Sequence, residues 1–145
     1  MRTRLLLSTL TLLLSGCASI WQDHGNVTET ALSPVQQRTV ANVMADAVFH
    51  HYGSRSVFSF PHRQTNTFAV QLAGALRARG IGVNESDDSQ GYYTPLHYKV
   101  VNLNPQQFYT ELDIRGLRIN QIWSLQDNIL APVATQTEGT LNGEG

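Results

Sequence analysis

Two stretches of the chain repeat their apolar residues at three- and four-residue steps, which is typical of amphipathic helices. Ser33 suits the N-cap of the first helix, Pro34 suits its first position, and Gln36 completes a capping box. Gly53 suits the left-handed conformation that ends many helices. The apolar stripe predicted for this helix comprises Val40, Val43, Met44, Ala47, Val48 and His51.

The second helix is predicted to start near Thr65 or Asn66 and to stop at Gly80. A strand over residues 55–60, closed by Pro61, separates the two helices, and a short strand begins at Ile81. One face of the second helix carries Phe68, Leu72, Ala75 and Leu76, with Ala69 and Ala73 beside them.

The rest of the chain alternates apolar and polar residues, which favours strands. Predicted strands cover residues 96–101, 108–115, 117–125 and 129–133, with turns at residues 102–105, Gly116 and Asp127-Asn128. On the third of these strands Gln121 is the one polar residue in an otherwise apolar face. Short turns between successive strands favour antiparallel pairing. We therefore expect an α+β fold, with two helices packed on one face of a mainly antiparallel sheet, in the order helix, strand, helix, strands.

The first residues have the pattern of an export signal. Arg2 and Arg4 form a positive n-region, and a mostly apolar run follows from Leu5 to Leu14. This run is shorter than the roughly 20 apolar residues that span a bilayer. Residues 1–16 are therefore predicted to be a signal peptide.

The sequence Leu14-Ser15-Gly16-Cys17 resembles the lipobox of bacterial lipoproteins. The resemblance implies cleavage between Gly16 and Cys17, a lipid thioether on Cys17 and an acylated amine. Cys17 is the only cysteine, so an intrachain disulfide is excluded. Ala18, in place of the Asp that tends to retain enteric lipoproteins in the inner membrane, indicates the outer membrane.

The predicted organisation after cleavage has three parts. Residues 17–32 are mostly small and polar and are interpreted as a lipidated tether. Trp21 in this tether is either an ordinary linker residue or a contact for the membrane interface or a partner. Residues 33–133 are predicted to form a single domain, and residues 134–145 a flexible tail.

Charge excludes one class of function. Without Arg2 and Arg4, eight basic residues remain against eleven acidic ones, a net charge of −3. The remaining cations are scattered singly, so direct binding to nucleic acid is not expected.

The polar residues do not form a recognisable catalytic or metal-binding motif. The five histidines (His24, His50, His51, His62 and His97) have no spacing typical of a zinc site. Glu111 and Asp113 point the same way on one strand, but their side is interpreted as solvated surface. Glu85, Asp87 and Asp88 lack the ligand spacing of a calcium loop. We expect no catalytic residue, no cofactor and no metal.

Several short peptides resemble the TrbH conjugal-transfer lipoproteins. They follow the lipobox and the Ser33-capped helix, and comprise residues 76–80 (Leu-Arg-Ala-Arg-Gly), 95–98 (Pro-Leu-His-Tyr) and 125–132 (Leu-Gln-Asp-Asn-Ile-Leu-Ala-Pro). The resemblance implies an outer-membrane component of a conjugative type IV secretion apparatus. It also implies periplasmic and outer-membrane channel subunits as partners, with no small-molecule substrate. Cys17 is the one functional residue that it transfers.

Two other functions stay open at this point. One is a free-standing envelope lipoprotein that binds a small ligand or acts as an exclusion or adhesion factor. The other is a periplasmic enzyme, for which the sequence offers no convergent polar site.

Overall fold

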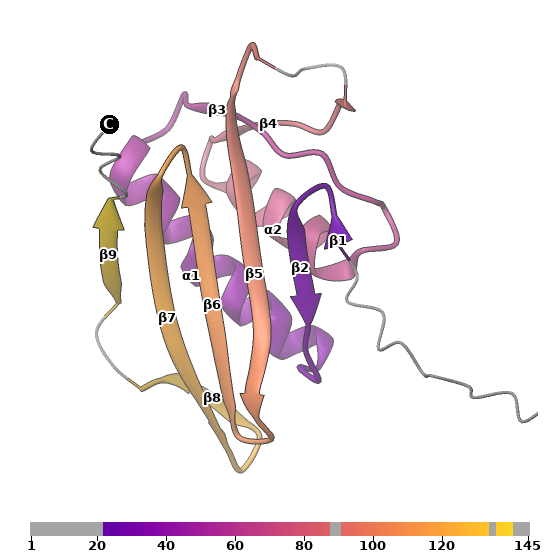
Figure 1. The fold of residues 1–145 in the computed structure, drawn as a ribbon, viewed down its shortest axis with the longest axis vertical. Coiled ribbons are helices and arrows are strands. Elements are labelled where there is room, and N and C mark those ends of the chain that lie inside the picture. The colour runs from indigo at the N-terminus through magenta and orange to yellow at the C-terminus, as the bar shows by residue number, and fades with distance from the viewer. Residues whose placement is uncertain (1–21, 88–90, 134–135, 141–145) are drawn as a thin grey trace, which may run out of the picture.

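The computed structural model describes residues 22–87, 91–133 and 136–140. Its two helices, α1 (Pro34–Tyr52) and α2 (Thr67–Ala78), pack against each other behind a large twisted sheet (Figure 1). The other face of the sheet carries no helix in this part of the chain. The prediction of an α+β fold with both helices on one face is therefore confirmed.

The sheet is built on one long central strand and an antiparallel meander. β5 pairs antiparallel with β6, β6 with β7, and β7 with β8. The other edge of β5 is shared by β3 and β2, both parallel to it; β4 extends β3, and β1 extends β2. The nine strands of the described residues are β1 (Gln22–Asp23), β2 (Asn26–Glu29), β3 (Val57–Ser59), β4 (Gly82–Asn84), β5 (Thr94–Asn104), β6 (Gln107–Ile114), β7 (Leu117–Gln126), β8 (Ile129–Pro132) and β9 (Thr137–Thr140).

The predicted start and end of α1 are confirmed. The Ser33 hydroxyl accepts a hydrogen bond from the Gln36 backbone, and the Gln36 side chain accepts one from the Ser33 backbone. The predicted apolar stripe is wrong at two positions, because Val43 and His51 are exposed whereas Ala41 and Ala45 are fully buried. The buried face is thus rotated toward the two alanines, whose small side chains allow neighbouring elements to approach closely.

The second helix follows the prediction closely. The Asn66 side chain accepts a hydrogen bond from the Ala69 backbone and caps α2, and Gly80 follows the helix with φ +78°. Phe68, Leu72 and Leu76 are buried in the core between the helices and the sheet.

A buried hydrogen bond joins the side chains of two neighbouring strands, β6 and β7. The hydroxyl of Thr110 on β6 accepts a hydrogen bond from the Trp123 indole at 3.0 Å, and both residues are buried.

Replacing Thr110 with valine keeps the shape of the side chain but leaves the indole N–H unpaired. We expect unfolding free energy to fall by about 1–3 kcal/mol in urea titrations. The same substitution at the exposed Thr137 is the control, and equal stability of the two variants would contradict this account.

The structure corrects the predicted tether. The folded part of the chain includes residues 22–32, since β2 pairs with β5 and Leu32 lies in the core. Asp23 and Asn26 are buried as well, although both are polar. This segment has no apolar period because hydrogen bonds rather than apolar side chains hold it to the domain. Residues Gly16, Cys17 and Trp21 lie outside the described residues.

The predicted tail is corrected in the same way. Part of it forms β9, which pairs antiparallel with the first half of β7. All four β9 residues are exposed, and Glu138 contacts His51 at the end of α1, with 2.9 Å between Oε1 and Nε2. A strand without buried side chains has no hydrophobic pattern, so its sequence gives no strand signal.

Candidate functional site

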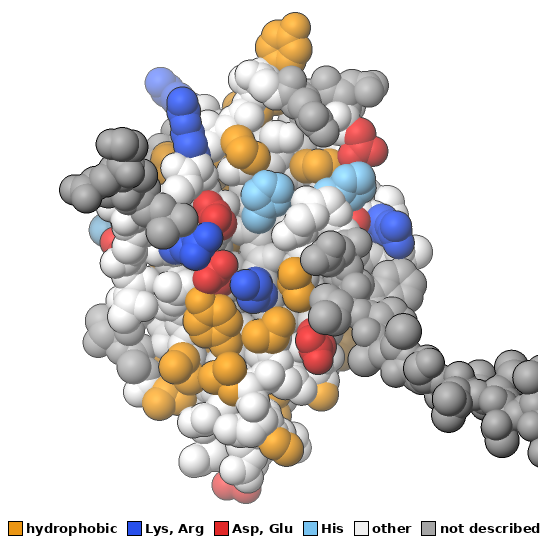
Figure 2. Space-filling view, in the orientation of Figure 1, with side chains coloured by type: hydrophobic (Ala, Val, Ile, Leu, Met, Phe, Trp, Pro, Cys, Tyr) orange, Lys and Arg blue, Asp and Glu red, His pale blue; other side chains and the backbone are white. Residues whose placement is uncertain are grey.

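The open face of the sheet, opposite the helices, is built mainly by the three long strands β5, β6 and β7. Its side chains come from alternate positions of β5, β6 and β7, the positions that point away from the core (Figures 1 and 2). The two-residue turn Arg115-Gly116, with positive φ at both residues, fixes the register of β6 and β7, and the short turn between Asn104 and Gln107 joins β5 to β6. Residues of different strands therefore line up in rows across the face.

One of these rows is apolar. Val101 on β5 is the register partner of Tyr109 on β6, and Tyr109 is the register partner of Ile122 on β7. The Val133 backbone donates a hydrogen bond of 2.9 Å to the Ile122 carbonyl and continues the row past β7. Ile122 is 39 % exposed and Val133 is 53 % exposed. We call these four residues the apolar row.

Two charged rows border the apolar row on one side. Lys99 lies 3.8 Å from Glu111 between Nζ and Oε1, and Arg118 lies 3.5 Å from Asp113 between Nε and Oδ2. Both pairs are partly exposed, so each contributes little to stability. These contacts engage the two carboxylates, Glu111 and Asp113, that the sequence places on one side of a strand. The Glu111 side chain is only 16 % exposed, so the pair belongs to an ion-pair network on the open face rather than to a freely solvated surface.

Tyr109 joins the apolar row to the charged rows. Its hydroxyl lies 2.7 Å from Glu111 Oε2 and 2.8 Å from Asn120 Oδ1. Burial, together with the hydrogen bond to the Glu111 carboxylate, raises the pKa of Tyr109 to about 12. A tyrosine with an apolar ring and a paired hydroxyl is typical of protein interfaces.

The raised pKa of Tyr109 predicts a late ionisation at alkaline pH. Burial likewise raises the pKa of Tyr98 to about 12, so two of the five tyrosines are expected to ionise well above the ordinary 10.0. The unfolded chain loses these two protons at a lower pH than the folded protein does. The contribution of the two hydroxyls to folding stability is therefore expected to be fully present below pH 10 and to fall as pH rises toward 12. Absorbance at the tyrosinate band after rapid pH jumps measures the ionisation of the folded protein. The Tyr109→Phe variant is expected to lack one of the two ionisations at high pH. Ionisation of all five tyrosines together near their ordinary pKa would contradict it.

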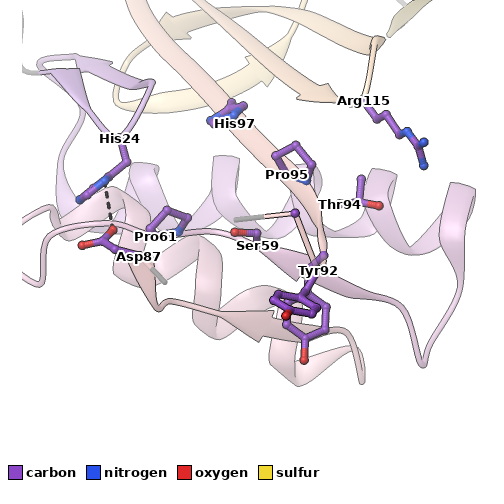
Figure 3. Close-up of a pocket in the computed structure, with 11 residues that line it drawn as sticks. His24, Ser59, Pro61, Asp87, Tyr92, Thr94, Pro95, His97 and Arg115 are labelled. Atoms are coloured by element: carbon purple, nitrogen blue, oxygen red, sulfur yellow. Dashed lines mark ion pairs between the residues drawn. The ribbon is translucent and has the colours of Figure 1, made fainter. Parts of the chain in front are cut away.

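A hollow of about 760 Å³ lies beside the N-terminal end of β5 (Figure 3). His24 and Asp87 contact each other across one side, with 3.3 Å between Nδ1 and Oδ1. Gly25 brings the turn before β2 against the ring of His97: its φ is +86°, and a Cβ there would lie 3.1 Å from His97 Nδ1. The hollow thus brings together two histidines that are far apart in sequence.

The hollow does not assemble a metal site from the described residues. No group of three or more His, Cys, Asp or Glu side chains with the geometry of metal ligands occurs among them. Glu85, from the acidic loop, pairs instead with Arg77 at 2.9 Å and lies 3.7 Å from His62. His51 contacts Glu138. The described histidines and carboxylates mainly connect neighbouring elements of the fold.

The apolar row was not identified from the sequence. Val101 and Tyr109 fall in the outward set of the predicted strands, but each is unremarkable by itself. A signal was available in the apolar residues at outward positions of three consecutive strands. It becomes informative only when the register places those residues side by side.

Comparisons with known proteins place the chain in a family. None of the described helices has the length and apolar character needed to cross a bilayer. No curated protein and no solved structure matches the chain significantly. The profile of the family described as "Conjugal transfer protein TrbH" matches residues 21–138, which is most of the chain. The chain therefore belongs to the TrbH family of conjugal transfer proteins.

Proposed function

We propose that this protein is a lipid-anchored, non-enzymatic component of a conjugative type IV secretion apparatus in the outer membrane. Family membership supports a role in conjugal transfer. The lipobox ending at Cys17 supports the lipid anchor, and Ala18 supports the outer membrane. In this role the folded domain faces the periplasm and binds channel subunits of the same apparatus.

The apolar row is the observation that carries the binding function. Protein interfaces combine an apolar centre with a polar rim, and tyrosine is enriched in them. The apolar row and the charged rows have this arrangement on a face that no described helix covers. The proposed partner is therefore a channel subunit with an apolar strip, flanked by charges that complement Lys99, Glu111, Asp113 and Arg118.

The hollow beside β5 favours a second candidate function. Its volume of about 760 Å³ lies within the range of small-molecule sites, and it is lined by both aromatic and polar side chains. A free-standing envelope lipoprotein that binds a small ligand would use it. Such a protein would be membrane-bound but would purify without channel subunits.

Replacing Cys17 with serine tests the anchor and the assembly together. Membranes are solubilised in mild detergent, and the tagged wild-type chain and the Cys17→Ser variant are purified from cells that carry the transfer operon. The wild type is expected in the membrane fraction and in a large particle with channel subunits. The variant has no thiol to form the thioether and no longer keeps an intact lipobox, so it is expected to be lost from the outer-membrane fraction and from the large particle.

Two results would contradict the proposal in different ways. If the Cys17→Ser variant stays in the outer-membrane fraction like the wild type, the lipid anchor is wrong. If the wild type is membrane-bound but runs as a small species alone, the apparatus function is wrong and the ligand-binding alternative is favoured.

A further inference from the structure

We propose that the β1 side of the domain is held against the lipid surface, so that the β8–β9 edge points away and the open face is presented sideways. The proposal rests on the lipid anchor of the proposed function. It adds an orientation: the surface formed by β1 and residues 62–66 is the membrane-proximal surface.

β1 is fixed firmly to the body of the domain. Asp23 is only 4 % exposed. Its carboxylate accepts hydrogen bonds from the Arg63 backbone at 2.9 and 3.1 Å and from the Asn66 side chain at 2.9 Å. A buried carboxylate with three such bonds is costly to release, because the charge would lose all of its partners. Asp23 therefore moves with the domain.

A second set of contacts holds the strand that follows. The Asn26 side chain accepts a hydrogen bond from the Tyr98 backbone at 3.1 Å and donates one to the Pro61 carbonyl at 3.4 Å. Thr28 Oγ1 lies 2.6 Å from the Tyr98 hydroxyl. These contacts tie β1 and β2 to β5 and to the segment before α2. The chain therefore leaves the lipid anchor and enters the fold at a single, fixed edge.

The chain between the anchor and Asp23 is short, which limits the distance between Asp23 and the lipid. Cys17 and Asp23 are six residues apart in sequence. A fully extended chain covers at most about 3.6 Å per residue, so Asp23 lies within about 22 Å of the lipidated residue whatever the conformation between them. The surface around Asp23 is thus confined near the headgroups.

The width of the sheet separates the β1 edge from the β8–β9 edge. β1 and β8 lie at opposite ends of the strand order β1-β2-β5-β6-β7-β8. Neighbouring strands are about 4.8 Å apart, so the two edges are separated by about 24 Å. Figure 1 shows β1 and β9 on opposite sides of the molecule with the sheet between them. Holding β1 near the membrane leaves the β8–β9 edge as the more distant one on average.

This orientation has a consequence for the apolar row. The sheet extends away from the membrane from one edge to the other, so its open face is turned toward neighbours in the plane of the membrane rather than toward lipid. A lateral neighbour in the apparatus can then reach Tyr109 and Ile122 without displacing the anchor.

Fluorescence quenching by lipids tests the orientation on the full lipidated chain. Cys17 is the only cysteine, and lipidation consumes its thiol, so a second cysteine gives one labelling site. We would compare Gln64→Cys, exposed and one residue from the Asp23 contact, with Ile129→Cys, exposed on β8. Each labelled protein is reconstituted into phosphatidylethanolamine–phosphatidylglycerol vesicles that carry a headgroup quencher.

The expected result is quenching several-fold stronger at position 64 than at position 129. A Gly/Ser insertion of about 20 residues after Trp21 adds roughly 25 Å of root-mean-square reach and is expected to reduce this difference. The orientation alone would be overturned if the protein floats with the vesicles and the two positions are quenched equally with the native tether. Protein that fails to float would overturn the lipid anchor, and the orientation with it.

Discussion

Replacing Ile122 with arginine is expected to lower capture of channel subunits by about 30-fold, the loss that corresponds to a hot spot of ~2 kcal/mol. Ile122 continues the apolar row from Tyr109 and is 39 % exposed, so its side chain is available to a partner. An arginine at this position places a charge in the apolar centre of the proposed interface. The quantity measured is the amount of channel subunit that co-purifies with the membrane-bound protein.

A matched control separates loss of binding from loss of folding. Val70 on α2 is also 39 % exposed, but it lies on the helical side of the domain. Val70→Arg introduces the same charge at the same exposure and is expected to leave capture unchanged. Both variants should unfold within about 0.5 kcal/mol of the wild type, as is usual for surface substitutions. Equal capture by Ile122→Arg and Val70→Arg would contradict the binding function assigned to the open face.

Replacing Tyr98 with alanine is expected to have the largest effect on stability, about 3–5 kcal/mol, as for other buried aromatic residues. The Tyr98 ring packs against Phe68 with 4.8 Å between ring centroids, so the substitution leaves a cavity between β5 and α2. It also removes the hydroxyl that lies 2.6 Å from Thr28 and accepts a hydrogen bond from Asn66 at 2.8 Å. Urea unfolding measures the loss.

Tyr98→Phe separates the hydroxyl from the ring. It keeps the packing but leaves Thr28 and Asn66 without this partner, so a smaller loss of about 1–3 kcal/mol is expected. Proteolysis should then cut the segment before α1 faster, because β2 is held less firmly. Tyr92→Phe is the control, since Tyr92 is 86 % exposed. Wild-type stability and wild-type proteolysis of Tyr98→Phe would show that the hydroxyl does not hold the N-terminal strands.

The elements that the sequence predicts well are those whose side chains bury one face. α1, α2 and the β6–β7 hairpin carry clear periods, and their ends have caps or turn residues whose chemistry is local. Gln121 was the odd polar residue of its strand face, and it is indeed buried there. Its position follows from strict alternation, which holds whatever the residue type.

The segments that the sequence misses are held by distant partners. β2 pairs with β5 about 70 residues later in the chain, and its Asn26 and Thr28 side chains bond to Tyr98 and to the Pro61 carbonyl. β9 has only exposed side chains and depends on the edge of β7. Neither has a hydrophobic period, so no local pattern separates these strands from a tether or a tail.

The candidate surface was missed for a related reason. The sequence correctly places Tyr109 and Val101 on the outward side of their strands. That they meet each other and Ile122 depends on the strand register, which the Arg115-Gly116 turn and the pairing of β5 with β6 determine together. The proposed lipid anchor, by contrast, rests on a linear sequence motif, which is recognised without any knowledge of the fold.

Photo-crosslinking from position 122 in mating cells tests the proposed interface most directly. A photoreactive amino acid is placed at Ile122, and in a parallel strain at Val70, and the cells are irradiated while the transfer apparatus is assembled. The proposed interface predicts covalent adducts with a channel subunit from position 122 and none from position 70. Adducts from position 70 alone, or from neither position in cells that transfer plasmid normally, would contradict the proposal that the open face of the sheet binds the apparatus.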